Sequence, residues 1–249
     1  MFVRLIPVLR GFAFAAVALA SLSCANKPPT GGPGTYRGVL AGTIELGTVQ
    51  VTVAEAGSGP LPASGTIDLG GTVVSLSGTL DQSSANISLS STDGYQLAGV
   101  SRPTYVFGSY QGPQDSGSFA LLLESADSSP IRLLCGSFVD TASTGTSPST
   151  PFPFGVTASI PSGLAFCVSP GFTWFGTLSA NDTLSCQSGG GLFLGNTNAD
   201  GGNQWGTGND YGTWALAPCA AGAADGGVDS GTDNVPDAGA GDSADGQAG

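Results

Sequence analysis

The chain has 249 residues, with 41 glycines, 16 prolines, five cysteines and no histidine, and its formal net charge is −12. Without histidine, Ser–His–Asp catalysis, Cys–His catalysis and histidine-ligated zinc sites are excluded from this chain. Its six basic residues are too few for a surface that follows phosphates, so we expect no nucleic-acid partner. Glycine, serine, threonine and valine dominate, which is typical of an all-β protein with many turns.

The first segment, 1–23, has the features of a signal peptide. Arg4 and Arg10 flank the start of an apolar or small run, 11–22. That run is too short to cross a bilayer core of about 30 Å as a helix, but it suits the apolar region of a signal peptide. We therefore expect export from the cytoplasm.

The run ends in Ser21-Leu22-Ser23-Cys24, which resembles the lipobox of bacterial lipoproteins. The match departs at Ser21, where the family has an apolar residue. The resemblance implies that Cys24 becomes a lipidated first residue that holds the protein to a membrane of the cell envelope. Ala25, in place of an aspartate, favours the outer membrane, with the protein facing the periplasm or the exterior. The alternative is an ordinary secretory signal, with Cys24 as a disulfide partner.

Two low-complexity segments flank the middle of the chain. Residues 24–35 are rich in proline and glycine, which predicts a spacer between the lipid and a folded domain. Residues 220–249 contain glycine, alanine and regularly spaced aspartates, with no aromatic or basic residue. This composition predicts a disordered acidic tail, with weak cation or partner binding as the alternative to a simple solvating role.

The middle of the chain alternates between β-favouring runs and Gly, Asn, Asp or Pro turns. Thr48-Val49-Gln50-Val51-Thr52-Val53 shows the period of two expected of a strand with one buried face. Because no convincing amphipathic helix is present, we predict an antiparallel meander that forms a barrel or a sandwich. The expected strands are 36–45, 48–54, 63–69, 72–80, 86–90, 95–101, 104–110, 116–124, 131–139, 154–160, 163–169, 172–179, 183–188, 191–195 and 212–217.

Short motifs recur in the same order in two stretches, 36–125 and 131–219. The matched motifs are Gly78-Thr79-Leu80 with Gly176-Thr177-Leu178, Gly99 with Gly195, Val106–Ser109 with Gln204–Thr207, Gly117–Leu121 with Gly212–Leu216, and Gly34-Thr35-Tyr36 with Gly136-Ser137-Phe138. A near-constant offset predicts two tandem related halves, with one larger barrel or sandwich as the alternative. The pattern resembles the Gly-rich β-meander modules of bacterial envelope and secreted proteins, which implies a surface location but no activity.

Four cysteines remain after Cys24, and all of them lie in the second stretch. An even number in an exported protein predicts two disulfides. Cys135 opens the first strand of this half and Cys219 follows the last, so a closed sheet would bring them together and leave Cys167 for Cys186. The alternative pairing is Cys135 with Cys167 and Cys186 with Cys219.

The best candidate for a metal site is the segment Asn196-Thr-Asn198-Ala-Asp200-Gly-Gly. It resembles the opening of a calcium loop, in which alternating oxygens converge on one cation. The first ligand is Asn rather than Asp, and the twelfth position is Thr207 rather than Glu, although Asp210 could add a carboxylate. The alternative is an Asn/Asp/Gly turn without a metal, so weak Ca²⁺ binding is the only cofactor prediction.

A cluster of rings forms the second candidate site. Trp205, Tyr211 and Trp214 lie within ten residues, among amide and carboxylate side chains. Such residues can stack on a sugar face and bind its hydroxyl groups, whereas the alternative is core packing, which suits Trp214 best.

We therefore expect a non-catalytic, membrane-anchored envelope lipoprotein that displays a β-rich interaction or structural module. Its partners would be the membrane, through the lipid, and an envelope protein or polysaccharide. The first alternative is a carbohydrate-binding module, assisted by calcium, and the second is a hydrolase with paired carboxylates.

Overall fold

The computed structural model describes residues 29–55, 59–125, 130–140, 151–198, 203–207 and 210–220. The predicted signal peptide, Cys24 and nearly all of the acidic tail lie outside these residues. The described chain is all-β, as predicted, and forms two closed antiparallel barrels of eight strands each. Within the described ranges, no helix is long and apolar enough to span a membrane.

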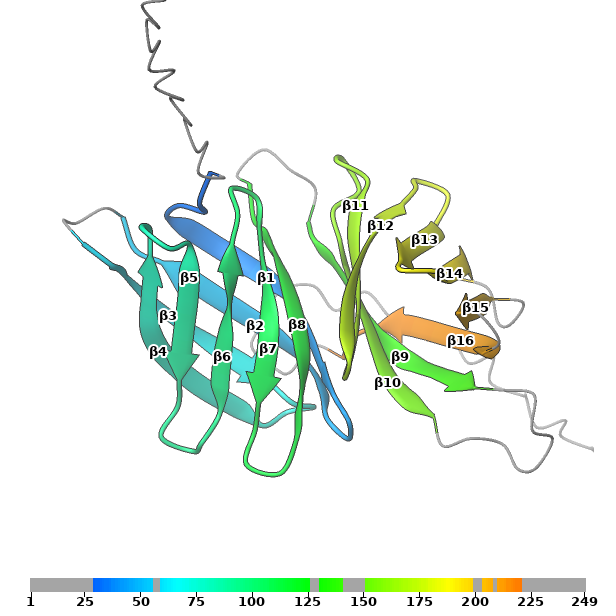
Figure 1. Ribbon diagram of the computed structural model, residues 1–249, viewed down its shortest axis with the longest axis horizontal. Helices are drawn as coiled ribbons and strands as arrows, with labels where there is room; N and C mark the ends of the chain where they lie inside the picture. Colours follow the sequence, from blue (N-terminus) through cyan, green and yellow to red (C-terminus); the bar gives the residue numbers. More distant parts are fainter. Residues whose placement is uncertain are drawn as a thin grey trace, which may run out of the picture.

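The first barrel is a meander in which each strand pairs with the next and the last pairs with the first (Figure 1). Its alternating strands bury one face, so that Val49, Val51 and Val53 point into the core while Gln50 and Thr52 are exposed. Its strands are β1 (Gly34–Gly42), β2 (Leu46–Val53), β3 (Leu61–Asp68), β4 (Val73–Asp81), β5 (Asn86–Ser90), β6 (Gln96–Ser101), β7 (Tyr105–Gln111) and β8 (Ser116–Leu123).

The second barrel repeats this order, with β9 paired to both β10 and β16. Its core is rich in rings, among which Phe154 and Phe193 stack at 4.5 Å between centroids. Its strands are β9 (Arg132–Asp140), β10 (Phe152–Ala158), β11 (Leu164–Ser169), β12 (Phe172–Leu178), β13 (Thr183–Ser188), β14 (Gly191–Asn196), β15 (Gln204–Thr207) and β16 (Asp210–Pro218).

Strand β15 is absent from the strands predicted from the sequence. This strand has only four residues, and glycines and asparagines surround it, so its local pattern is weak. It forms because β14 and β16 hydrogen-bond to it from both sides. Tertiary pairing therefore decides the structure of this segment.

The two halves correspond in the turn between their fourth and fifth strands. The only non-glycine residues with positive φ among those described are Ala85 (64°) and Asp182 (63°), each in the turn between the fourth and fifth strands of its barrel. Each accepts a backbone hydrogen bond from the end of the sixth strand, from Ser101 at 2.7 Å and from Thr197 at 2.9 Å. The predicted tandem halves are thus present as two barrels of one topology.

Two of the predicted motif matches have the wrong register. Gly38 pairs with Leu121, and Gly136 pairs with Leu216, so Gly136 is equivalent to Gly38 rather than to Gly34. In the same way Tyr110 pairs with Gly117 while Trp205 pairs with Gly212, which makes Trp205 the equivalent of Tyr110. Glycine is so common in this chain that a match of three or four letters cannot fix a register.

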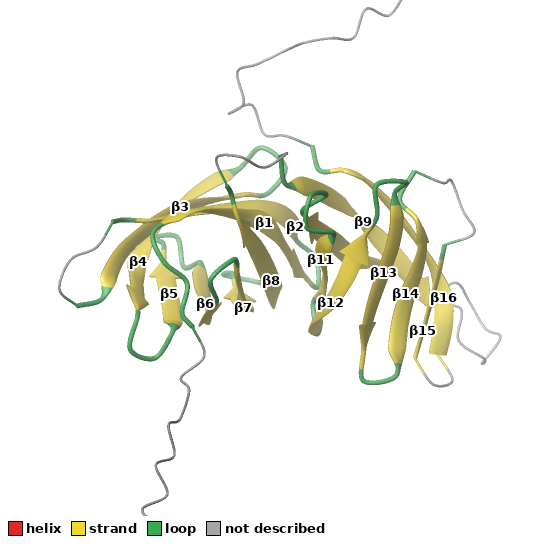
Figure 2. Cartoon of the chain, turned by 90° about the horizontal axis from the view of Figure 1, so that it is seen from above, coloured by secondary structure: helices red, strands yellow, loops and turns green. Residues whose placement is uncertain are grey.

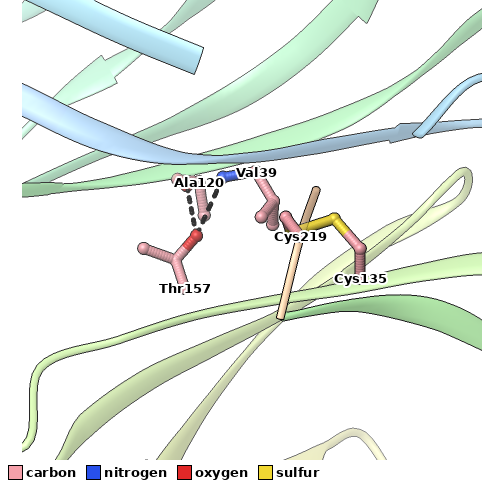
Figure 3. Close-up of a disulfide and its surroundings, with 5 residues drawn as sticks. All are labelled: Val39, Ala120, Cys135, Thr157 and Cys219. Atoms are coloured by element: carbon pink, nitrogen blue, oxygen red, sulfur yellow. Dashed lines mark hydrogen bonds between the residues drawn. A yellow bond between two sulfur atoms is a disulfide. The ribbon is translucent and has the colours of Figure 1, made fainter. Parts of the chain in front are cut away.

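The two barrels lie side by side and share a third apolar cluster (Figure 2). At its centre the hydroxyl group of Thr157, on β10, accepts a hydrogen bond from the Val39 N–H and donates one to the Ala120 carbonyl, both at 2.9 Å (Figure 3). Val39 and Ala120 are partners across β1 and β8. A side chain of the second barrel therefore hydrogen-bonds to both of the strands, β1 and β8, whose pairing closes the first barrel.

Candidate functional site

The candidate site is an open groove at one end of the first barrel. The turns that follow β1, β3, β5 and β7 meet at this end, which is the lower end in Figure 1. The groove has a volume of about 340 Å³ and is lined by Ile44, Glu45, Leu46, Leu69, Gly70, Thr72 and Tyr95. Binding sites in barrels commonly lie at such a mouth, and this volume is at the small end of their range.

Asp115 fixes the turn that carries Ile44 and Glu45. It is 4% exposed, and its carboxylate accepts hydrogen bonds from the backbone of Thr43, Ile44, Glu45 and Ser116 and from the Thr43 hydroxyl group. Burial alone would raise the pKa of Asp115. The hydrogen bonds together lower the pKa by more than burial raises it, so the pKa lies below its usual value. We therefore assign Asp115 a positioning role, as an ionised carboxylate whose oxygens are already occupied.

Glu45 is the carboxylate that lines the groove itself. Burial, followed by the negative charge of Asp115, raises its pKa, while a hydrogen bond from the Tyr95 hydroxyl group lowers it by less. That hydroxyl group lies 3.5 Å from Oε1 of Glu45. Oε2 is buried and has no hydrogen-bond partner among the described residues. Because Oε2 is closed to solvent, a donor from a ligand in the groove would meet Glu45 at Oε1, whose contact with Tyr95 is long.

Two tyrosines support the groove. Tyr95 lines it and stacks on Tyr110, with 6.2 Å between the ring centroids. Tyr110 is 2% exposed, and its Oη, like Oε2 of Glu45, has no partner among the described residues. A methyl group placed on Gly112 would lie 2.5 Å from Tyr110 Oη and 3.2 Å from Glu45 Oε2. These two polar atoms thus lie close to the same backbone position, at a residue without a side chain.

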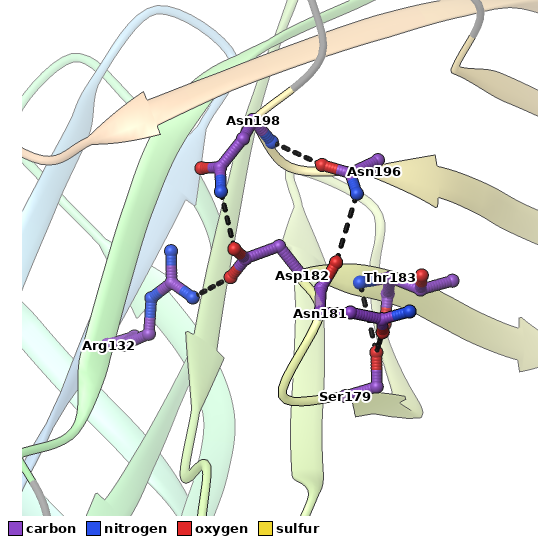
Figure 4. A network of polar contacts seen from close by, with 7 residues as sticks. All are labelled: Arg132, Ser179, Asn181, Asp182, Thr183, Asn196 and Asn198. Atoms are coloured by element: carbon purple, nitrogen blue, oxygen red, sulfur yellow. Dashed lines mark hydrogen bonds and ion pairs between the residues drawn. The ribbon is translucent and has the colours of Figure 1, made fainter.

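The predicted calcium residues form an ordinary turn where they are described. Oδ1 of Asn196 accepts the Asn198 N–H at 2.8 Å, and the Asn198 side chain donates to Asp182, which also pairs with Arg132 (Figure 4). Asp200 and the side chain of Asp210 lie outside the described part of the chain. Among the described residues no group of three or more His, Cys, Asp or Glu side chains that could hold a metal ion is present. The calcium site therefore stays a prediction.

Two of the three rings in the predicted aromatic cluster follow the alternative of core packing. Trp205 and Trp214 are 8% and 2% exposed, and they pack in the core of the second barrel. Their indole N–H groups donate to the carbonyls of Val139 and Gln204, both at 2.9 Å. Only Tyr211 is exposed, at 57%. The two tryptophans alternate with outward-facing residues on β15 and β16, so they serve the core and cannot stack on a sugar.

The predicted disulfides are present. Cys135 pairs with Cys219, and Cys167 pairs with Cys186. The first bridge lies beside the cluster between the barrels (Figure 3), and the second lies within the core of the second barrel. The pairing that a closed sheet favours is thus the one observed.

Sequence reasoning missed Glu45, Tyr95 and Tyr110. They come from three different segments, and no spacing links them because the turns meet only when the barrel closes. The one available signal was that glutamate is rare, with Glu45, Glu55 and Glu124 as its only occurrences. A comparison of the chain with models of known protein families, with curated proteins and with solved structures finds no match.

Proposed function

We propose that this protein is a non-catalytic, lipid-anchored protein of the cell envelope, and that its two barrels form an interaction module. The observation that carries the proposal is the direction of the chain through the first barrel. The described chain enters β1 at Gly34, at the end opposite the turn that holds Glu45 (Figure 1). A lipid on Cys24 would therefore hold one end at the membrane and leave the groove facing away from it.

Two further features support this proposal. Disulfides persist in oxidising compartments such as the periplasm and the cell exterior, and this chain contains two of them. Both barrels are filled by clusters of buried side chains, from Tyr36 to Leu121 in the first and from Leu134 to Trp214 in the second. Partners would therefore meet the turns and outer faces rather than a lumen, as in an interaction module.

The proposal is tested by the intact mass of the protein purified from its native membranes. We expect the mass of residues 24–249 plus acyl groups, with a gain of two hydrogens for each disulfide on reduction. Cys24→Ala should move the protein from the membrane fraction to the soluble fraction. An unmodified mass with a free thiol at Cys24 would contradict lipid anchoring.

A further inference from the structure

We propose that the groove at the mouth of the first barrel binds a primary alkylammonium group, with the Glu45 carboxylate as its counter-ion and the Tyr95 ring at its side. This inference rests on the proposed role as an interaction module and names the chemistry that the module recognises.

The first step is the shortage of hydrogen-bond donors at the Glu45 carboxylate. Oε2 of Glu45 is buried without a partner, and Oε1 accepts only the long contact from Tyr95 among its described hydrogen bonds. An ammonium group carries three N–H donors and a positive charge. It can therefore donate to Oε1 of Glu45 and balance the charge of the carboxylate, and charge-assisted hydrogen bonds of this kind are the strong ones.

The second step is the charge around the groove. Asp68, Asp93 and Asp115 lie in or beside the turns that meet at this end, together with Glu45. Among the described residues the basic side chains are Arg37, Arg102 and Arg132. Arg37 and Arg102 lie at the opposite end of the first barrel, and Arg132 pairs with Asp182 in the second barrel. The field at the groove is therefore negative, which attracts a cation and repels phosphates and carboxylates.

The third step is the shape of the walls. Ile44, Leu46 and Leu69 line the groove beside Glu45, and the Ile44 side chain is 70% exposed. Such walls suit an aliphatic stem rather than a bare metal ion, which would need several oxygen ligands. The Tyr95 ring adds a face on which a cation can rest. Together these features favour a charged head on an apolar chain.

The test is a titration of the full chain in a non-ionic detergent at pH 7.5, followed by backbone amide NMR. The probe is pentylammonium chloride, and pentan-1-ol serves as its neutral counterpart. We expect saturable shifts at Ile44, Glu45, Leu69 and Tyr95, and at least tenfold weaker binding of the alcohol. Cadaverine and Nα-acetyl-lysine methylamide then distinguish a free polyamine from a lysine side chain, according to which binds more tightly.

Matched variants decide the role of Glu45. Glu45→Gln keeps the shape and removes the charge, so it should weaken pentylammonium binding at least tenfold. Glu55→Gln makes the same charge change at an exposed residue at the opposite end, so it should leave binding within twofold of the unchanged protein. The amide spectrum of each variant verifies that it is folded.

A pH series adds an independent readout. Because the pKa of Glu45 is raised, its carboxylate takes up a proton above the usual range, and binding should weaken as the pH falls through that value. The inference would be overturned if the alcohol and the amine bound equally well, or if Glu45→Gln bound the amine as the unchanged protein does. It would also be overturned if a neutral disaccharide shifted the groove residues and the amine did not. The intact mass tests only whether Cys24 carries a lipid, whereas the titration tests only the groove. Failure of the lipid-anchor proposal is therefore distinguishable from failure of the alkylammonium proposal.

Discussion

The two barrels share strand order but differ at the closing seam, by which we mean the pairing of the first strand with the last, β1 with β8 and β9 with β16. In the first barrel the N–H of Glu124 donates to Thr35 at 2.8 Å, and in the second the N–H of Cys219 donates to Leu133 at 3.0 Å. At this equivalent place the first barrel has an ion pair between Arg37 and Glu124, with 3.3 Å between the charged atoms. The second barrel has the Cys135–Cys219 disulfide instead.

The difference shows that the same pair of backbone positions can be linked either by an ion pair or by a disulfide. The two side chains of the ion pair are 35% and 38% exposed, so solvent weakens their attraction. The disulfide closes a long loop and removes many conformations from the unfolded chain. We therefore expect the second barrel to depend on oxidising conditions and the first to be almost indifferent to them.

Removal of the seam disulfide has the largest expected effect. Its cysteines are separated by 84 residues, for which loop-closure entropy gives about 4.5 kcal/mol. Cys135→Ala with Cys219→Ala should lower the free energy of unfolding of the second barrel by that order. All three tryptophans lie in this barrel, so tryptophan fluorescence in urea measures the change. An unchanged midpoint would contradict the comparison.

Transfer of the disulfide to the first barrel sharpens the comparison. Because the backbones correspond, Arg37→Cys with Glu124→Cys should form a new bridge. We expect a stability gain of about 3 kcal/mol for the first barrel, somewhat below the entropic value because engineered bridges carry strain. Peptide mapping without reduction identifies the bridge, and hydrogen exchange of β1 and β8 measures the gain. Free thiols at both positions would show that the two seams differ in backbone geometry.

The hydrogen bonds to the Asp115 carboxylate stabilise the first barrel from within. Asp115→Asn should lower the stability of this barrel by about 3 kcal/mol at neutral pH, because several buried N–H groups lose a charged acceptor. The pKa of Asp115 is lowered, so its stabilisation is complete above the ordinary pKa and disappears as the pH falls through the lowered value.

The difference in stability between Asp115→Asn and the unchanged protein should therefore shrink in acid, which urea titrations at several pH values measure. Glu45→Gln serves as the control of opposite sign. The raised pKa of Glu45 means that its charge opposes folding at neutral pH, so this variant should not be destabilised there. A constant difference for Asp115→Asn at every pH would show that its charge is not involved.

The Thr157 bridge tests whether the barrels can be compared as separate units. Thr157→Val removes the hydroxyl group and leaves the Val39 N–H and the Ala120 carbonyl without their partner, at a cost of about 2 kcal/mol. Hydrogen exchange of the first barrel and tryptophan fluorescence of the second should then report unfolding transitions that lie further apart than in the unchanged protein. Thr157→Ser keeps the hydroxyl group and should retain most of the coupling.

Loss of the ion pair has the smallest expected effect. Glu124→Gln should change the stability of the first barrel by less than about 1 kcal/mol, because the pair is partly exposed. Hydrogen exchange of β1 in low and high salt measures this change. A loss comparable to that of the disulfide would remove the contrast between the two seams.

The sequence predicted the class of fold because strands with one buried face carry their own period, as Thr48–Val53 does. It predicted the disulfides because Cys135 and Cys219 bracket a sheet that closes. It could not predict the register of the halves, since glycine motifs recur by chance. It also could not predict the groove, because Glu45 and Tyr95 are 50 residues apart and meet only through barrel closure. The burial of Trp205 could not be predicted either, because the closeness of Trp205 and Trp214 in the sequence does not reveal which face of its strand carries each ring.

The hydroxyl bridge of Thr157 has a consequence for the order of assembly. A chain that emerges with its N-terminus first completes β8 at Leu123 well before β10 is present. Until then Val39 and Ala120 have no access to the hydroxyl group that joins them. The first barrel is thus made first, but it gains its final hydrogen bonds only when β10 of the second barrel has been made.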